Sequence, residues 1–281
     1  MRDNRIARRG TMRPRYLTKS RFKLGLDCPT KLFYTGKNAI YPNRNADNEF
    51  LQFLAEGGFQ VGKLAQCYYP EGIEVESTDH ATALAQTDEL MQRTDVVIFE
   101  AAFRHDDLFV RVDVLVKRGD AIQLIEVKAK SMDPDDPTKS FMGSRGGIRS
   151  GWVEYLYDIA FQQHVFINAY PAHEPFTQAY LMLADTSKTA SVDGLNQRFI
   201  VDASRRVQTR GDVTPEGLGE PILTAFPVDE IITHIKNEDC VKRNGYPFDV
   251  FIRHLAAHYT QDRKIEPVLT AECKACELNF N

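Results

Sequence analysis

The sequence contains no long apolar run, few cysteines and little net charge. None of its stretches approaches the roughly 18 to 20 consecutive apolar residues that a membrane span needs, and its basic first segment leads into no hydrophobic signal core. We therefore expect a cytoplasmic protein without membrane contacts. A composition of 43% hydrophobic and 26% charged residues excludes a disordered or collagen-like chain and favours an ordinary globular protein.

The five cysteines argue against a disulfide framework, because their number is odd and no secretion signal precedes them. They could instead ligate a metal or a cluster, or pack inertly in the core. Cys273 and Cys276 alone have ligand spacing, as a CxxC pair. One such pair is a weak signal, because a four-ligand site needs two further donors.

Positive charge is concentrated at the N-terminus, although the whole chain has a formal charge of −4. Residues 1–24 contain a single acid, Asp3, and a series of basic residues: Arg2, Arg5, Arg8, Arg9, Arg13, Arg15, Lys19, Arg21 and Lys23. We interpret residues 1–14 as a basic tail, which could hold a polyanion through counterion release or simply be solvated. The remaining length suits one large α/β domain over residues 15–264, followed by a cysteine-bearing segment over residues 265–281.

The periodicity of apolar residues predicts both helices and strands. Helical spacing covers residues 45–65, with a break at Gly57 and Gly58, and residues 78–93, with Thr78 or Asp79 as the N-cap. Alternating runs over 96–104, 108–117 and 121–128, separated by short polar turns, predict three consecutive antiparallel strands. After a loop over 131–150, the expected elements are a helix over 151–170, strands over 177–183 and 197–201, and helices over 228–235 and 248–259.

The turn between the second and third of these strands fixes which side chains face each other. If Gly119 and Asp120 form a two-residue turn, Asp113 lies directly opposite Glu126, with Cβ atoms about 4.5 to 5.5 Å apart. The other face is then apolar, which supports the register because a slip of one residue would scatter its members. Its expected pairs are Val112 with Val127 and Val114 with Ile125.

The preceding turn extends this row of acids. If Asp106 and Asp107 form it, Glu100 pairs with Asp113, and three carboxylates cross the sheet side by side. This turn lacks glycine, and His105 could widen it. Its register would also pair Phe99 with Val114, Ala101 with Val112 and Phe103 with Val110.

Carboxylates that lie opposite each other repel, so this row needs a compensating cation. Mg²⁺ or Mn²⁺ is the natural candidate, because hard cations prefer carboxylate oxygens. Lys128 follows Glu126 by two residues on the same face and could direct its charge at an anionic oxygen beside the metal. The alternative is a surface network of salt bridges, in which Arg111 and Lys128 neutralise the acids without a metal.

Val112 and Asp113, followed after a gap of twelve residues by Glu126, Val127 and Lys128, match a D…ExK signature. This pattern resembles the PD-(D/E)XK nuclease superfamily, and more narrowly the RecB-like nucleases with an iron–sulfur cluster: the AddB-type and CRISPR-associated exonucleases and their uncharacterised bacterial relatives. Other stretches resemble this group in the same order. They are residues 17–34 with the lone early cysteine, 58–70 with the first nuclease motif, 155–166 with the QxxxY motif, and the late cysteine pair.

The resemblance implies a restriction-endonuclease-like α/β core, with a mixed central sheet flanked by helices and chain ends joined near the cysteines. It implies hydrolysis of DNA phosphodiesters, with exonuclease action on single-stranded ends in repair, recombination or defence. The implied catalytic residues are Asp113, Glu126, Lys128 and Gln162. Mg²⁺ or Mn²⁺ would be held by Asp113, Glu126, Val127 and, from the strand register, Glu100. As nucleic-acid contacts we expect Arg111 and Tyr155, together with Arg145 and Arg149 of the loop over 140–150, which could be a flap over the strand or be disordered.

The resemblance also implies a [4Fe–4S] cluster held by Cys28, Cys273 and Cys276. Because the family uses one early and three late cysteines, we expect the fourth ligand beyond Asn281 in a longer protein, with Cys240 as the substitute. Such a protein could carry a further C-terminal domain or bind a helicase partner. A zinc knuckle, or no ligand at all, remains the alternative for the CxxC pair.

Two departures from the family pattern keep open a function of a different class. Where family members often have a metal-binding His, this sequence offers Gln66, a weak substitute. The tyrosine of QxxxY is replaced by Phe166, which removes a hydroxyl but keeps a stacking surface. Without the resemblance, Tyr155, Asp158 and Gln162 would be a solvated stripe on one helix face. The alternative is a nuclease fold that binds or scaffolds DNA without cutting it.

Overall fold

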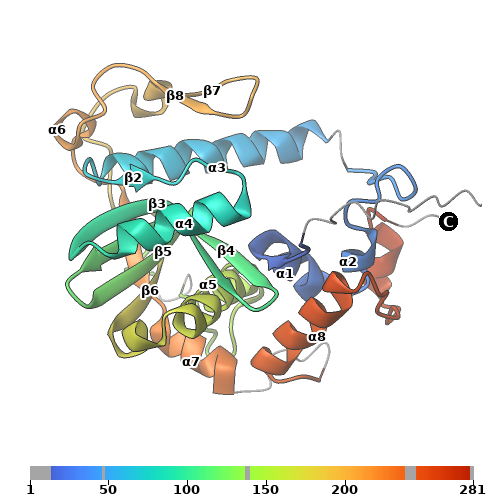
Figure 1. Cartoon of the computed structure of the whole chain (residues 1–281). Helices are drawn as coiled ribbons and strands as arrows, with labels where there is room; N and C mark the ends of the chain where they lie inside the picture. Colours follow the sequence, from blue (N-terminus) through green and yellow to red (C-terminus); the bar gives the residue numbers. More distant parts are fainter. Residues whose placement is uncertain (1–13, 46–47, 137–139, 238–244, 279–281) are drawn as a thin grey trace, which may run out of the picture.

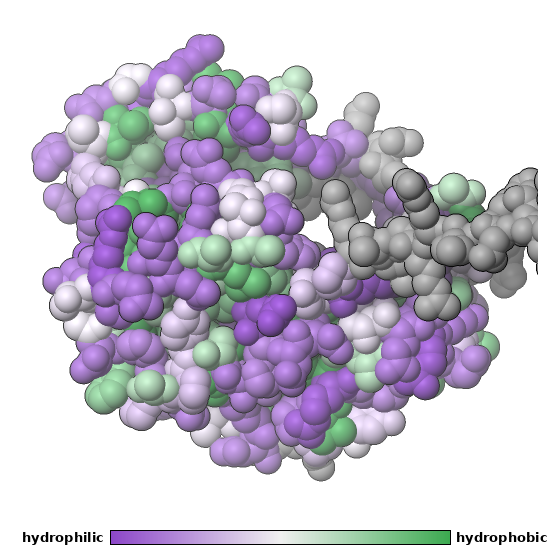
Figure 2. All heavy atoms as spheres, viewed as in Figure 1, coloured by the Kyte–Doolittle hydropathy of each residue, from purple (hydrophilic) through white to green (hydrophobic). Residues whose placement is uncertain are grey.

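A computed structural model describes residues 14–45, 48–136, 140–237 and 245–278. The predicted basic tail, apart from its last residue, and Cys240 lie outside these ranges. The face in Figure 2 is mostly hydrophilic, with apolar side chains in small scattered groups. None of the described helices is both long and apolar enough to cross a membrane.

Within the described residues, a seven-stranded mixed sheet forms the centre of the molecule (Figure 1). Its path is β2 (Ile73–Glu74), β3 (Asp95–His105), β4 (Leu108–Arg118), β5 (Ala121–Met132), β6 (Thr177–Asp185) and β9 (Leu223–Pro227), and β1 (Leu17–Thr18) pairs with β4 off this path. The pairs β3–β4, β4–β5 and β6–β9 are antiparallel, whereas β1–β4, β2–β3 and β5–β6 are parallel. The predicted fold class, a mixed sheet flanked by helices, is confirmed.

Two apolar cores lie between the sheet and its helices. The larger core includes residues of α1 (Lys19–Asp27), α2 (Lys31–Tyr34), α4 (His80–Met91), α5 (Ser150–Ala169), α7 (Asp229–Asn237) and α8 (Phe248–Thr260). The smaller core includes residues of α3 (Glu49–Cys67), α6 (Pro215–Leu218) and the hairpin of β7 (Phe199–Val201) and β8 (Val207–Thr209). Figure 1 shows α3 and this hairpin together on one side of the sheet and α5 and α7 on the other.

Both predicted hairpins have the expected register next to their turns, although the expected pairs Val112–Val127, Asp113–Glu126 and Glu100–Asp113 are absent from the ladders. His105 pairs with Leu108 and Arg118 with Ala121, so each turn has two residues. Gly119 has a φ of 58°, which glycine adopts without a steric penalty. Asp106 has a φ of 48° in the other turn, and Asp is among the few other residues that visit this region.

The alternation of side chains between the two faces changes at Glu100 and Asp113. Val114 packs in the smaller core, whereas Val112 packs in the larger one. Glu100 has a left-handed φ of 56°. Glu100 and Asp113 form no pair in the β3–β4 ladder, which continues on both sides of them. The prediction that Val112 and Val114 share one face is wrong: the β3–β4 ladder is interrupted at Glu100 and Asp113, and the valines on either side of Asp113 pack in different cores.

Helix α3 runs without a break through Gly57 and Gly58, contrary to the prediction. A glycine costs only about 1 kcal/mol in a helix interior, which a long helix that packs on the sheet tolerates. A Cβ at Gly58 would meet nothing within 4 Å. Replacing Gly58 with Ala is therefore expected to raise the free energy of unfolding by about 1 kcal/mol, measured by urea denaturation.

Gly72→Ala provides the control for this substitution. A Cβ at Gly72 would lie 2.1 Å from Cζ of Phe99, so the same change is expected to destabilise the protein. A stability of Gly58→Ala equal to or below that of the wild type would contradict the prediction.

His164 of α5 makes stability depend on pH. Burial, together with the charges of Lys236 and His105, lowers its pKa to about 4. Asp249 acts in the opposite direction, Arg253 in the same direction, and the Phe248 ring lies edge-on at 6.2 Å. An unfolded His has a pKa near ~6.5, so the unfolded chain binds a proton between these values and the native protein does not.

We expect this difference to remove about 2 kcal/mol of stability as the pH falls from about 6.5 to 4, and to have no effect above 6.5. Urea denaturation of the wild type and of His164→Gln at pH 7.5 and at pH 4.5 measures it. The variant should lose less stability than the wild type on acidification. Equal losses would contradict the assignment.

Candidate functional site

Strands β4 and β5 separate at the point where their acidic residues lie. The ladder between them ends at Val114 and Ile125. Beyond it, the start of β4 pairs with β1. Helix α1 follows β1 directly, so its first residue, Lys19, reaches the opening between the two strands.

Glu126 is completely buried at this opening. Its Oε2 accepts hydrogen bonds from Gln162 Nε2 at 2.8 Å and from Lys19 Nζ at 2.9 Å. Its Oε1 accepts from Lys19 Nζ at 3.2 Å and from Lys128 Nζ. Burial acts to raise the pKa of Glu126, but the two ammonium groups outweigh it and hold this pKa well below its ordinary value.

Asp113 shares the Lys19 ammonium with Glu126. Its Oδ1 accepts from Lys19 Nζ at 2.9 Å, and its Oδ2 accepts from the backbone N–H of Val127 at 2.8 Å. Burial and the Glu126 charge raise the pKa of Asp113. The two carboxylates predicted to face each other do meet, with a lysine between them and no ladder pair at this position.

Lys128, Asp158 and Gln162 complete the buried network around Glu126. Lys128 Nζ lies 3.2 Å from Asp158 Oδ2, and Gln162 Nε2 donates to Asp158 Oδ1 at 3.0 Å. Burial and the Glu126 charge raise the pKa of Asp158 to about 6. Gln162 Oε1 is buried and accepts no hydrogen bond from the described residues. Glu126 and Asp158 are buried, whereas Asp113 and Glu100 are partly exposed, so the network runs from the interior to the surface. The ion pairs of the salt-bridge alternative, Arg111 with Glu100 and Lys128 with Glu126, are both present.

Sequence reasoning missed two members of this network. In the sequence, Lys19 is one member of the basic N-terminal series. In the fold, its ammonium bonds to Asp113 and Glu126, which lie 94 and 107 positions further along the chain. Asp158 was seen only as part of a solvated stripe. The four-residue spacing of Asp158 and Gln162 on α5 was the available signal for Asp158, whereas no local pattern pointed to Lys19.

Glu100 does not complete a row of three carboxylates. Its left-handed backbone takes it out of the ladder, and its Oε2 accepts from Arg111 Nε at 3.1 Å. Burial, and then the Asp113 charge, raise the pKa of Glu100. Arg111, expected to contact nucleic acid, also donates to the carbonyl oxygens of Ser77 and Val75. Among the described residues, no three His, Cys, Asp or Glu side chains form a group able to hold a metal.

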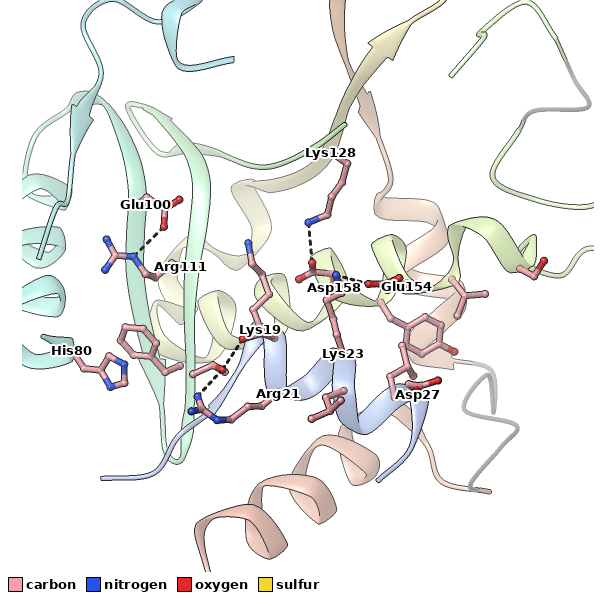
Figure 3. A pocket seen from close by; sticks show the side chains of 18 residues that line it. Lys19, Arg21, Lys23, Asp27, His80, Glu100, Arg111, Lys128, Glu154 and Asp158 are labelled. Atoms are coloured by element: carbon pink, nitrogen blue, oxygen red, sulfur yellow. Dashed lines mark hydrogen bonds and ion pairs between the residues drawn. The ribbon is translucent and has the colours of Figure 1, made fainter. Parts of the chain in front are cut away.

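A cleft of about 1100 Å³ opens beside this network, between α1, α5 and the start of β4 (Figure 3). Lys19, Lys128 and Asp158 of the network line it, whereas Asp113 and Glu126 do not. Its wall on the α1 side carries Lys19, Arg21 and Lys23, and Lys128 and Arg111 line it from the sheet. The other charged lining residues are Asp27, Glu100, Glu154 and Asp158. Basic side chains on two sides make the cleft suited to an anionic polymer.

The remaining predicted nucleic-acid contacts do not line this cleft. Arg145 is exposed in a turn, and Arg149 Nε donates to the Met142 carbonyl at 3.2 Å at the start of α5. Tyr155 is half-buried, with Lys128 Nζ 6.0 Å and Lys130 Nζ 5.3 Å from its ring centre. Tyr155 therefore lies beside the network but does not line the cleft.

The two departures from the family pattern have structural roles. Gln66 accepts from Lys63 at 2.9 Å on its own helix, and no described hydrogen bond joins it to the carboxylates. Phe166 is completely buried, with its ring edge-on to Phe103 at 4.9 Å. Phe166 therefore keeps a stacking surface, which packs against Tyr170 within the apolar core.

The predicted cluster cysteines lie around a second cavity, of about 800 Å³. Cys28, Cys273 and Cys276 all line it, although they do not form a metal-binding group as they stand. The backbone N–H of Thr270 donates to Cys273 Sγ at 3.4 Å. Lys31 Nζ lies 2.8 Å from Glu277, so an ion pair joins the early and late segments at this cavity.

Compared with models of protein families, the chain matches none, and comparison with curated proteins finds no match either.

Proposed function

We propose that this protein is a metal-dependent DNA nuclease that hydrolyses phosphodiester bonds, acting as an exonuclease on single-stranded ends. The observation that carries this proposal is the convergence of Asp113 and Glu126 on one cation, with Lys128 beside them at the cleft. Nucleases of this kind need two carboxylates and a nearby lysine at a site that a phosphate can enter.

The residues at the site fit Mg²⁺ or Mn²⁺. Mg²⁺ is typically bound by one or two carboxylates together with waters and substrate phosphates, so a pair of acids is sufficient. Asp113 and Glu126 would hold the ion, with the Val127 carbonyl as a further oxygen donor. The unsatisfied Gln162 Oε1 could accept a hydrogen bond from a bound water. When bound, such an ion supplies a Lewis acid that polarises the phosphate and lowers the pKa of water.

The protein's own residues would orient the substrate. Lys128 is held between Glu126 and Asp158, which keep its ammonium charged and fixed. From that position it can stabilise the negative charge that develops on the phosphate oxygens. Arg21 and Lys23 on the wall of the cleft can bind the phosphates that flank the scissile bond.

Titration with Mn²⁺ and end-labelled single-stranded DNA tests the proposal. The wild type should shorten the strand, whereas Asp113→Ala and Lys128→Ala should not. Lys188→Ala is the matched control, since this lysine bonds to Thr224 and does not line the cleft. Cleavage by both site variants at the wild-type rate would contradict the assignment.

One observation favours a second function, a nuclease fold that binds DNA without cutting it. The Lys19 ammonium bonds to both Asp113 and Glu126, so the two acids have a cationic partner without a metal. In the same titration, such a protein would retard the strand without shortening it at any Mn²⁺ concentration.

We also propose a [4Fe–4S] cluster at the second cavity, with Cys28, Cys273 and Cys276 as ligands. Three thiols around one cavity support it, and the N–H···S bond to Cys273 is of the kind that tunes such clusters. Visible absorption of the anaerobically purified protein distinguishes a cluster from colourless zinc. Cys28→Ala should lose this absorption, whereas Cys67→Ala should retain it, because Cys67 does not line the cavity.

A further inference from the structure

Lys19 joins the two carboxylates from outside the strands that carry them. Its ammonium donates to Asp113 at 2.9 Å and to both oxygens of Glu126 at 2.9 and 3.2 Å. Figure 3 shows its side chain extending from α1 into the space between the Glu100–Arg111 pair and the Lys128–Asp158 pair. Lys19 also lines the cleft, so it contacts both the buried acids and the space open to substrate.

Glu126 has no acceptor position left for another cation. A carboxylate offers about four lone-pair positions. Both oxygens of Glu126 accept from Lys19, and each accepts one further bond, from Lys128 or from Gln162. A metal ion can therefore bind Glu126 only if one of these donors leaves.

Lys19 is the donor with a route out. Its side chain is 26% exposed, against 18% for Lys128, whereas Gln162 is fully buried. Lys128 also pairs with Asp158, and Gln162 also donates to Asp158, its neighbour on α5. Lys128 also lines the cleft, but its departure would take the cation from the buried Asp158 as well as from Glu126. The departure of Lys19 leaves Glu126 with two other donors and uncovers only the partly exposed Asp113.

The local charge also favours this exchange. Asp113, Glu126 and Asp158 face Lys19 and Lys128, so three formal negative charges meet two positive ones and the cluster has a charge of −1. A divalent cation in place of the Lys19 ammonium would bring the cluster to zero. Buried charge is costly unless it is compensated, so neutralisation would offset the loss of the lysine's bonds.

We propose that Lys19 closes the carboxylate pair in the metal-free protein and leaves it for the cleft when a divalent cation binds. This inference rests on the metal site of the proposed function and adds an order of events to it. Once released, the Lys19 ammonium would join Arg21 and Lys23 on the wall of the cleft. Metal loading would then add a positive charge at the position where a phosphodiester enters.

Calorimetric titration with Mn²⁺ alone, without DNA, tests this exchange. Lys19→Met keeps the length of the side chain but removes the ammonium, so the ion no longer has to replace it. We expect the variant to bind Mn²⁺ at least about tenfold more tightly than the wild type, since each tenfold corresponds to only about 1.4 kcal/mol. Lys188→Met is the matched control, because Lys188 is exposed, bonds to Thr224 and Asp185, and does not line the cleft. Its affinity should stay at the wild-type level.

The possible results separate the inference from the function on which it rests. Equal or weaker Mn²⁺ binding by folded Lys19→Met, with a wild type that binds, would overturn the exchange and leave the metal site standing. The absence of Mn²⁺ binding in the wild type and in both variants would overturn both.

A second measurement needs no variant and covers the case in which Lys19→Met does not fold. Acetylation of the wild-type protein, read by mass spectrometry, reports which lysines are accessible. Mn²⁺ should increase the modification of Lys19 severalfold and leave that of Lys23 unchanged. Lys19 reactivity that does not change with Mn²⁺ would overturn the exchange.

Discussion

Under the proposed nuclease function, replacing Glu126 with Gln is expected to lower phosphodiester cleavage by about a thousandfold or more while the protein remains folded. Glu126 is the carboxylate on which Lys19, Lys128 and Gln162 all converge. Gln keeps the size of the side chain but removes the negative charge that a divalent cation requires. The ion would lose one of its two acidic ligands, and Lys128 would lose one of the groups that orient it.

The fold should survive this change because each lysine keeps a second acidic partner. Lys19 retains Asp113, and Lys128 retains Asp158. The formal charge of the cluster would change from −1 to zero, so no buried charge is left without compensation. We expect the free energy of unfolding to fall by about 1 to 3 kcal/mol, the usual cost of weakened hydrogen bonds to charged groups.

Single-turnover cleavage of labelled single-stranded DNA at saturating Mn²⁺, together with urea denaturation, measures both effects. Glu154→Gln is the matched control, because Glu154 also lines the cleft but is 58% exposed and pairs with Lys23 rather than with the carboxylates. That variant should cut at nearly the wild-type rate. If Glu126→Gln also did so, or if both variants were equally slow, the buried carboxylate would not be the centre of the reaction.

Local signals predicted the register that places Asp113 near Glu126. The Gly119 turn, with its positive φ, fixes the hairpin, and the pairing of Val114 with Ile125 follows from it. The alternation of apolar residues supports this register only up to Val114, because Val112 packs in the other core. These signals act over a few residues, so they can be read from a single chain. Such local signals do not indicate at which residue the hydrogen bonding between two strands ends. In this sheet, β4 and β5 separate just beyond Val114. That separation makes room for a side chain from a distant segment.

Lys19 could not be predicted because its position depends on tertiary structure. The pairing of β1 with β4 brings the start of α1 to the carboxylates, and this parallel pairing involves only two residues on each strand. A strand of two residues is too short to show an alternating pattern of apolar and polar residues in the sequence. Glu100 illustrates the same limit, since its left-handed backbone replaced an expected pairing with Asp113 by a bond to Arg111. A strained residue at such a place is a common feature of functional sites.

The anchoring of α1 to the core predicts the largest stability effect. Phe22 is completely buried, stacked on Phe161 of α5 with ring centres 4.5 Å apart. Phe248 and Phe251 of α8 pack edge-on against it at 6.1 and 6.5 Å. Replacing Phe22 with Ala is therefore expected to lower the free energy of unfolding by about 3 to 5 kcal/mol, through lost burial and the cavity that remains.

Urea denaturation measures this loss, and Phe176→Ala is its matched control, because that ring is 51% exposed and its removal should cost well under about 1 kcal/mol. Phe22 is three residues from Lys19 on α1, so the same cavity should loosen the hold of this helix on the carboxylates. Acetylation of Lys19 in Phe22→Ala should then rise without any metal, under conditions where the variant is still folded. A variant that lost stability but kept Lys19 protected would mean that the carboxylates, and not the aromatic cluster, hold this end of α1 in place.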